Sequence, residues 1–112
     1  MGCYAKERIL NADSRAISTV TYMEYVPFCR NKKELLVFKK LLDTLGFRIY
    51  EIDTAISLQS RQFVNTFALS HSVEMADALI AATALQRDEI LCTSNAKHFL
   101  PIENLKLDIF LP

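Results

Sequence analysis

Asp77 is the residue of this sequence that most strongly suggests chemistry. It lies in a run that is apolar on nearly every side, from Met75 to Leu85. An ionised carboxylate in such a run costs free energy unless it has a partner, a metal ion or a shifted pKa. No Lys or Arg lies within one helical turn of it in the sequence. We therefore expect a metal-binding or catalytic role for Asp77, or else a structural hydrogen bond to a loop backbone.

Two further groups of polar residues are candidates for the same site. Glu24 lies early in the helix expected after the first strand, although an exposed helix glutamate explains it equally well when it is taken alone. Thr93 and Asn95 close a short strand, which places them at the carboxyl edge of a parallel sheet, where open α/β sheets bind ligands. Ordinary turn chemistry explains these two residues nearly as well.

The histidines and cysteines lack the spacing of a zinc site or a disulfide framework. His71 and His98 have no ligand-type partner four residues away; His98 could contact a substrate beside Asn95, whereas His71 is expected to cap or pack. The three cysteines are odd in number, which favours a reducing, cytoplasmic compartment. Cys92 lies in an apolar run, and we expect it to be a core residue rather than a nucleophile.

The composition is that of one packed globular domain, which we expect to span residues 1–112. Of the 112 residues 51% are apolar, and there are only 2 Gly and 3 Pro, which argues against disorder. The 13 Lys and Arg balance the 13 Asp and Glu, so any contact with nucleic acid must be local rather than driven by net charge. The longest apolar stretch, Ala78–Ala82, is too short for a membrane span.

Strands and helices are expected to alternate along the chain. The patterns predict helices over residues 4–11, 20–30 (interrupted by Pro27), 32–45, 54–69 and 70–87. They predict strands over residues 15–20, 47–52, 89–93 and 105–109, with a loop or a single helical turn over 94–99. Ser18 or Thr19 and Asn31 are suited to cap helices, and Gly46 to end one. This alternation indicates an α/β fold with a mostly parallel sheet covered by helices on both faces.

Three segments, taken together and in order, resemble a known family. Ile17–Glu24, Met75–Ala84 and Leu91–Phe99 resemble the three later motifs of the PIN-domain ribonucleases, and especially of the VapC-type toxins. The resemblance covers practically the whole chain, and Ala-Asp-Ala-Leu-Ile-Ala-Ala is its most specific part. It implies a PIN-like, Rossmann-like parallel sheet and a metal-dependent endoribonuclease acting on RNA.

The resemblance also implies roles for individual residues. Glu24 and Asp77 match the acidic residues that hold Mg²⁺ or Mn²⁺, and Asn95 matches a position where family members have Asp or Asn. Thr93 matches a polar residue that lines the site, and Ser18 is a second supporting residue near the end of its strand. Oxygen donors of this kind suit hard divalent cations. A cognate antitoxin protein and a homodimer are the implied partners.

The beginning of the sequence departs from the family pattern. Family members begin with a central apolar strand that ends in the first acidic ligand, and no such segment precedes Tyr4. The expected shortfall is roughly 10 to 20 residues. Without that strand, neighbouring strand edges should be unpaired unless the fold closes the gap, borrows a strand or associates. Without that Asp, metal affinity and turnover should be lower.

Three functional hypotheses follow. The first is a PIN-type ribonuclease toxin held by its antitoxin. The second is a catalytically impaired PIN remnant that acts as an RNA- or antitoxin-binding module. The third is a structural α/β domain in which Asp77 is a satisfied core carboxylate. Metal titration of the chain against an Asp77→Ala variant separates the third hypothesis from the other two.

Overall fold

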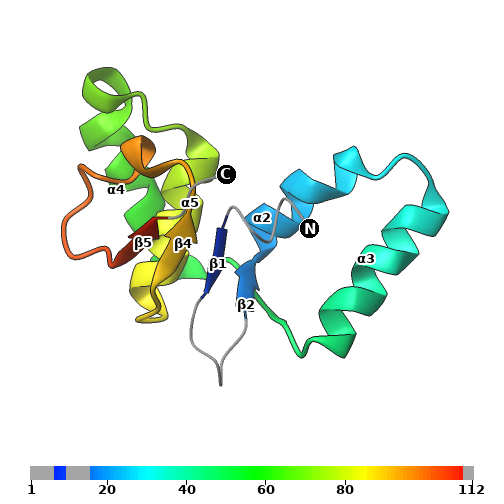
Figure 1. Ribbon diagram of the computed structural model, residues 1–112. Helices are drawn as coiled ribbons and strands as arrows, with labels where there is room; N and C mark the ends of the chain where they lie inside the picture. The colour runs from blue at the N-terminus through cyan, green and yellow to red at the C-terminus, as the bar shows by residue number, and fades with distance from the viewer. Residues whose placement is uncertain (1–6, 10–15, 110–112) are drawn as a thin grey trace.

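The structure is a computed structural model that describes residues 7–9 and 16–109 (Figure 1). Seven of its elements lie in the first two thirds of the chain: β1 (Glu7–Ile9), β2 (Ala16–Ser18), α2 (Thr19–Tyr25), the 3₁₀ turn η1 (Val26–Phe28), α3 (Lys32–Thr44), β3 (Arg48–Tyr50) and α4 (Thr54–His71). Four follow: α5 (Met75–Gln86), β4 (Leu91–Thr93), the 3₁₀ turn η2 (Ala96–His98) and β5 (Leu107–Ile109). Each predicted strand and helix from residue 15 onward is therefore present, with shifted ends.

The starts of α2 and α3 follow the predicted capping chemistry, and α4 begins in the same way at Asp53, a cap that was not predicted. The Ser18 hydroxyl accepts a hydrogen bond from the Val20 N–H at 3.0 Å, which begins α2 directly after β2. The Asn31 side chain accepts from the Glu34 N–H at 2.9 Å, and that of Asp53 accepts from the Ile56 N–H at 2.9 Å. Each oxygen satisfies a backbone donor that has no partner within its own helix.

The ends of α2 and α3 are also those expected. Pro27 lies in η1, where the chain tightens after Tyr25 instead of continuing α2. Gly46 adopts a left-handed φ of 72° after α3, and the Phe47 N–H donates to the Leu42 carbonyl at 2.9 Å. Helices often end in this way, with a glycine in the left-handed conformation and a backbone hydrogen bond back to the last turn. The glycine at position 46 therefore explains why α3 ends where the sequence predicts.

The strands form two sheets rather than one. In the first, β2 pairs with β3 in parallel, and in the second, of order β1-β4-β5, β4 pairs with β5 in parallel. The parallel pairs predicted from the alternating pattern are therefore confirmed. In the described part of the chain the five strands do not join into a continuous five-stranded sheet.

The helix predicted over residues 4–11 is wrong at its centre. Residues 7–9 form β1, which pairs antiparallel with β4, with Arg8 opposite Cys92; residues 4–6 and 10–11 lie outside the described residues. An eight-residue pattern is too short to distinguish a helix from a strand, and the unpaired edge of β4 offers the backbone hydrogen bonds that decide between them. β1 lies beside β2 as well as β4, where the two sheets meet (Figure 1).

The predicted helix over residues 70–87 begins five residues too early. α4 continues through His71, Ser72 adopts a left-handed φ of 55°, and α5 starts at Met75. Asp77 therefore lies in the first turn of α5 and not in the second, as the longer helix would place it.

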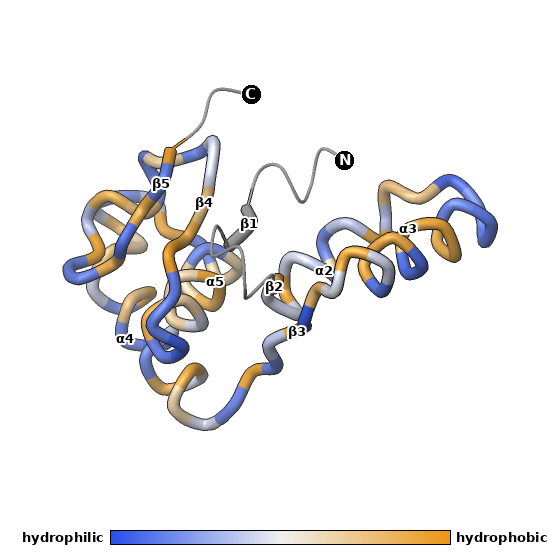
Figure 2. Tube along the Cα trace, turned by 60° about the horizontal axis from the view of Figure 1, so that its bottom comes forward, coloured by the Kyte–Doolittle hydropathy of each residue, from blue (hydrophilic) through white to orange (hydrophobic). Residues whose placement is uncertain are grey.

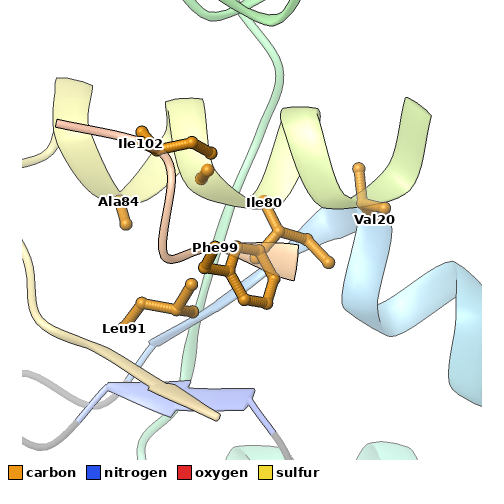
Figure 3. Close-up of a cluster of buried hydrophobic side chains, with 7 residues drawn as sticks. Val20, Ile80, Ala84, Leu91, Phe99 and Ile102 are labelled. Carbon is orange, nitrogen blue, oxygen red and sulfur yellow. The ribbon is translucent and has the colours of Figure 1, made fainter. Parts of the chain in front are cut away.

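One apolar core holds α5 against the second sheet and against α2. Phe99 and Ile102 from the segment after β4 pack with Leu91, Ile80 and Val20 (Figure 3). Because Val20 lies on α2 and Ile80 on α5, this core fixes the two helices that carry Glu24 and Asp77 against each other.

The helices α2 and α3 form an arm that projects from the rest of the molecule (Figures 1 and 2). A second, smaller core of Ile17, Phe38 and Leu42 holds the arm together. The tilted rings of Tyr22 and Tyr25 pack against Phe38 at centroid distances of 5.3 and 4.3 Å. Among the described residues, no helix is long and apolar enough to cross a membrane.

Candidate functional site

Asp77 lies at the N-terminus of α5, with its side chain 19% exposed. Its Oδ2 accepts a hydrogen bond from the Glu74 N–H at 3.2 Å, so the carboxylate helps to begin the helix. The N-terminus of a helix is a position at which acidic side chains are common. The carboxylate is therefore half-buried rather than enclosed, and no hydrogen bond from the described residues occupies its Oδ1.

His98 is the side chain that approaches Asp77 most closely from a distant part of the chain. Its Nδ1 lies 3.4 Å from Asp77 Oδ2, and its side chain is 21% exposed. The approach is possible because η2 follows directly after the end of β4. This places Asp77 beside the carboxyl end of β4, at the sheet edge from which a ligand site was expected.

Thr93 and Asn95 lie at the same strand end but differ in exposure. Thr93 is completely buried, and its Oγ1 accepts the Asn95 N–H at 3.0 Å. Asn95 is exposed and precedes η2, the turn that carries His98. Thr93 thus shapes the loop, whereas the Asn95 amide faces solvent.

Glu24 lies in the last turn of α2, on its exposed side. The packing of Val20 against Ile80 places α2 beside α5, but Glu24 comes four residues after Val20, about 6 Å further along the axis. In the described ranges, no group of three or more His, Cys, Asp or Glu side chains could hold a metal ion. Glu24 and Asp77 thus lie on two helices that pack against each other, but among the described residues they are not part of a larger cluster of possible metal ligands.

Ser18 is 7% exposed, and its hydroxyl is engaged by the Val20 N–H. It therefore positions α2, the helix that carries Glu24.

His71 and Cys92 both contribute to packing rather than to the site. His71 packs edge-on against Phe67 at a centroid distance of 5.7 Å, which confirms the expectation that it packs. Cys92 is 1% exposed in β4 and is a core residue, as predicted.

The projecting arm carries an apolar groove on its surface. The groove has a volume of about 430 Å³ and runs between η1 and α3, where Tyr25, Phe28, Val37 and Leu41 line it. Phe28 is 78% and Val37 60% exposed, which is high for side chains of this kind. Lys33 and Glu34 add charge to the same lining.

The family is decided by a comparison with sequence models of known families. The model described as PIN domain matches residues 3–101. The chain belongs to the PIN domain family. The match includes all three segments on which the resemblance rests, and comparison with curated proteins gives no match.

Three solved structures share the fold of this chain. DNA-bound VapBC from Salmonella typhimurium has a TM-score of 0.74 at 22% identity, covering 89% of this chain and 78% of that chain. VapBC2 from Rickettsia felis, bound to a DNA fragment from its promoter, has a TM-score of 0.65 at 25% identity, with coverages of 85% and 74%. FitAcB from Neisseria gonorrhoeae has a TM-score of 0.63 at 26% identity, with coverages of 88% and 76%. These similarities confirm the PIN fold.

The PIN family generally comprises nucleases that use divalent metals, and the donor atoms around Asp77 fit such an ion in part. Asp77 offers one carboxylate oxygen without a hydrogen bond from the described residues, and His98 offers a nitrogen next to it. Magnesium-type sites in enzymes often use only one or two carboxylates and complete their coordination with water and substrate phosphate. Asp77 supplies one such carboxylate, and among the described residues no group of three or more possible ligands surrounds it.

Proposed function

We propose that this PIN domain is a metal-dependent endoribonuclease of the VapC toxin type, which hydrolyses RNA phosphodiester bonds. The observation that carries the proposal is the half-buried Asp77 carboxylate at the N-terminus of α5, beside the carboxyl end of β4. The match of the PIN family to residues 3–101 supports it independently.

The residues have distinct proposed tasks. Asp77 and Glu24 hold Mg²⁺ or Mn²⁺, and the Asn95 amide, exposed at the end of β4, contacts the phosphate or a metal-bound water. Thr93 fixes the turn that presents Asn95, and Ser18 fixes the start of α2. The ion, when bound, supplies charge stabilisation and lowers the pKa of a water molecule at the phosphodiester.

The test measures cleavage of a single-stranded RNA by the purified chain. A single-stranded DNA of the same sequence serves as the control substrate. We expect internal cleavage of the RNA in Mg²⁺ or Mn²⁺, no cleavage in EDTA, and recovery when the metal is restored. Cleavage that persists in EDTA would contradict the metal-dependent mechanism. Binding of RNA without any cleavage would favour the second hypothesis, a catalytically impaired PIN module.

We propose an antitoxin protein as the partner, because the structural neighbours include VapBC complexes. The groove between η1 and α3 is suited to bind an amphipathic segment of it, since its centre is apolar and its lining includes Lys33 and Glu34. The homodimer stays a prediction.

Val37→Glu should weaken antitoxin binding at least ~10-fold, because it places a charge in the apolar part of this groove. Isothermal titration of the chain with the antitoxin of the same pair measures the effect. Lys40→Glu is the matched control, since Lys40 is an exposed residue of α3 that does not line the groove. Equal affinities for the Val37→Glu variant and the original chain would place the antitoxin elsewhere.

A further inference from the structure

Positive charge is concentrated in one segment of the chain, from η1 to β3. Residues 26–50 contain six of the 13 Lys and Arg residues but only two of the 13 Asp and Glu residues. This segment therefore has a formal charge of +4, and the rest of the neutral chain has a charge of −4. All six basic side chains are exposed: Arg30, Lys32, Lys33, Lys39, Lys40 and Arg48. The roles proposed for Asp77 and for the apolar groove do not explain this separation of charge.

The four lysines of α3 make no ion pair within the described part of the chain. Arg30, by contrast, is paired with Glu34, with its Nη2 atom 2.8 Å from Glu34 Oε2. The second acidic residue of α3, Asp43, comes near the C-terminal end of the helix. The ammonium groups of these lysines are therefore available to an anion from outside the chain.

Three of these lysines lie on one side of α3, next to the apolar groove. Lys33 lines the groove, whereas Lys32, Lys39 and Lys40 do not. Lys39 comes seven residues, or two helical turns, after Lys32, so both lie on the same face, about 10 Å apart along the axis. Three stacked nucleotides of a single strand, at ~3.4 Å each, have about this length. We call Lys32, Lys39 and Lys40 the lysine face of α3.

We propose that the lysine face of α3 binds the phosphate backbone of the single-stranded RNA that the protein cleaves. The inference rests on the proposed function, which supplies RNA as the substrate. Because the whole chain has no net charge, the attraction of a polyanion has to come from a local group of cations, and lysines along one helix supply it. Phosphate contacts of this kind position a nucleic acid without reading its sequence.

The arm lies within reach of an RNA strand that is also bound near Asp77. The helices α2 and α3 project from the rest of the molecule (Figure 2), whose longest dimension is 40 Å. A stacked single strand of about 12 nucleotides has this length, at ~3.4 Å for each nucleotide. One RNA of about 15 nucleotides is therefore long enough to contact both the lysine face and Asp77.

The experiment measures binding of a fluorescein-labelled, 15-nucleotide single-stranded RNA to the full chain by fluorescence anisotropy, in EDTA to prevent cleavage. For the original chain, the logarithm of the affinity should fall with the logarithm of the salt concentration with a slope of about −2 or steeper, since each phosphate contact contributes ~0.7. The double variant Lys39→Gln and Lys40→Gln should bind at least ~10-fold more weakly at about 0.1 M salt, and its slope should be shallower by about 1.4. Glutamine has nearly the helix propensity of lysine, so α3 should be retained.

The matched control is the double variant Arg61→Gln and Lys106→Gln. It removes the same charge from two exposed residues, one in α4 and one just before β5. This control should bind the RNA as tightly as the original chain does. An equal loss of affinity in both double variants would assign the effect to net charge and overturn the inference.

The outcomes separate this inference from the proposed function. An unchanged RNA affinity and salt slope in the lysine variant would overturn the inference, whether or not the chain cleaves RNA. If the lysine variant lost antitoxin binding or self-association but kept its RNA affinity, the face would serve a protein and the inference would also be overturned. RNA binding that depends on the lysine face, without cleavage in Mg²⁺ or Mn²⁺, would support the binding surface and contradict the proposed function.

Discussion

Asp77→Asn is expected to lower the rate of RNA cleavage at least ~100-fold and to weaken Mn²⁺ binding to a similar degree. The substitution removes the negative charge that attracts the ion, and loss of an outer-shell partner of a metal ligand alone costs about 10–100-fold. The asparagine oxygen can still accept the Glu74 N–H, so the start of α5 should be retained. Rates are measured on one labelled RNA at saturating Mn²⁺, and circular dichroism checks the fold.

Asp43→Asn is the matched control for this prediction. Asp43 is an exposed aspartate near the C-terminal end of α3, so its substitution removes the same charge from another part of the surface. The control should retain full activity. If Asp43→Asn and Asp77→Asn reduced cleavage equally, general electrostatics would explain the loss, and Asp77 would have no specific role.

Phe99→Ala is expected to destabilise the fold by about 3–5 kcal/mol, because it removes a large side chain from the main core and leaves a cavity. Phe99 is 1% exposed and packs with residues from α2, α5 and β4. A domain of this size is stable by only about 5–15 kcal/mol, so the variant should be partly unfolded near body temperature. Urea unfolding followed by circular dichroism measures the loss.

Leu100→Ala is the control for this stability prediction. Leu100 is the next residue and is 66% exposed, so its truncation should change the free energy of unfolding by less than about 0.5 kcal/mol. A loss of less than about 1 kcal/mol in Phe99→Ala would show that the segment after β4 contributes little to the core.

Local chemistry made most of the fold predictable from the sequence. Ser18, Asn31 and Asp53 cap helices because their side chains reach a backbone N–H two or three residues later, and this depends on sequence neighbours alone. Pro27 and Gly46 stop helices through their own backbone restrictions.

The features that were not predictable depend on contacts between distant residues. The pairing of Arg8 with Cys92 brings together residues far apart in the chain, and no local pattern in residues 4–11 indicates it. The break between α4 and α5 was predicted between residues 69 and 70 but lies at Ser72, because the residues on both sides favour helices and do not fix its position.

The candidate site was predictable in its acidic part but not in its histidine. Asp77 stands out as a charge in an apolar run, whereas His98 approaches it only through the packing of η2 against α5. The one signal for His98 in the sequence was its position shortly after the strand that ends at Thr93. This position predicted that His98 lies near the site, but it did not predict the contact with Asp77.

The most direct test of the central claim is the rate of RNA cleavage as a function of Mn²⁺ concentration, measured in parallel with Mn²⁺ binding. If Asp77 holds the ion on which cleavage depends, the two half-saturation points should coincide, and both signals should be lost in Asp77→Asn. Cleavage that continues without bound metal, or that survives in Asp77→Asn at the original rate, would contradict the account.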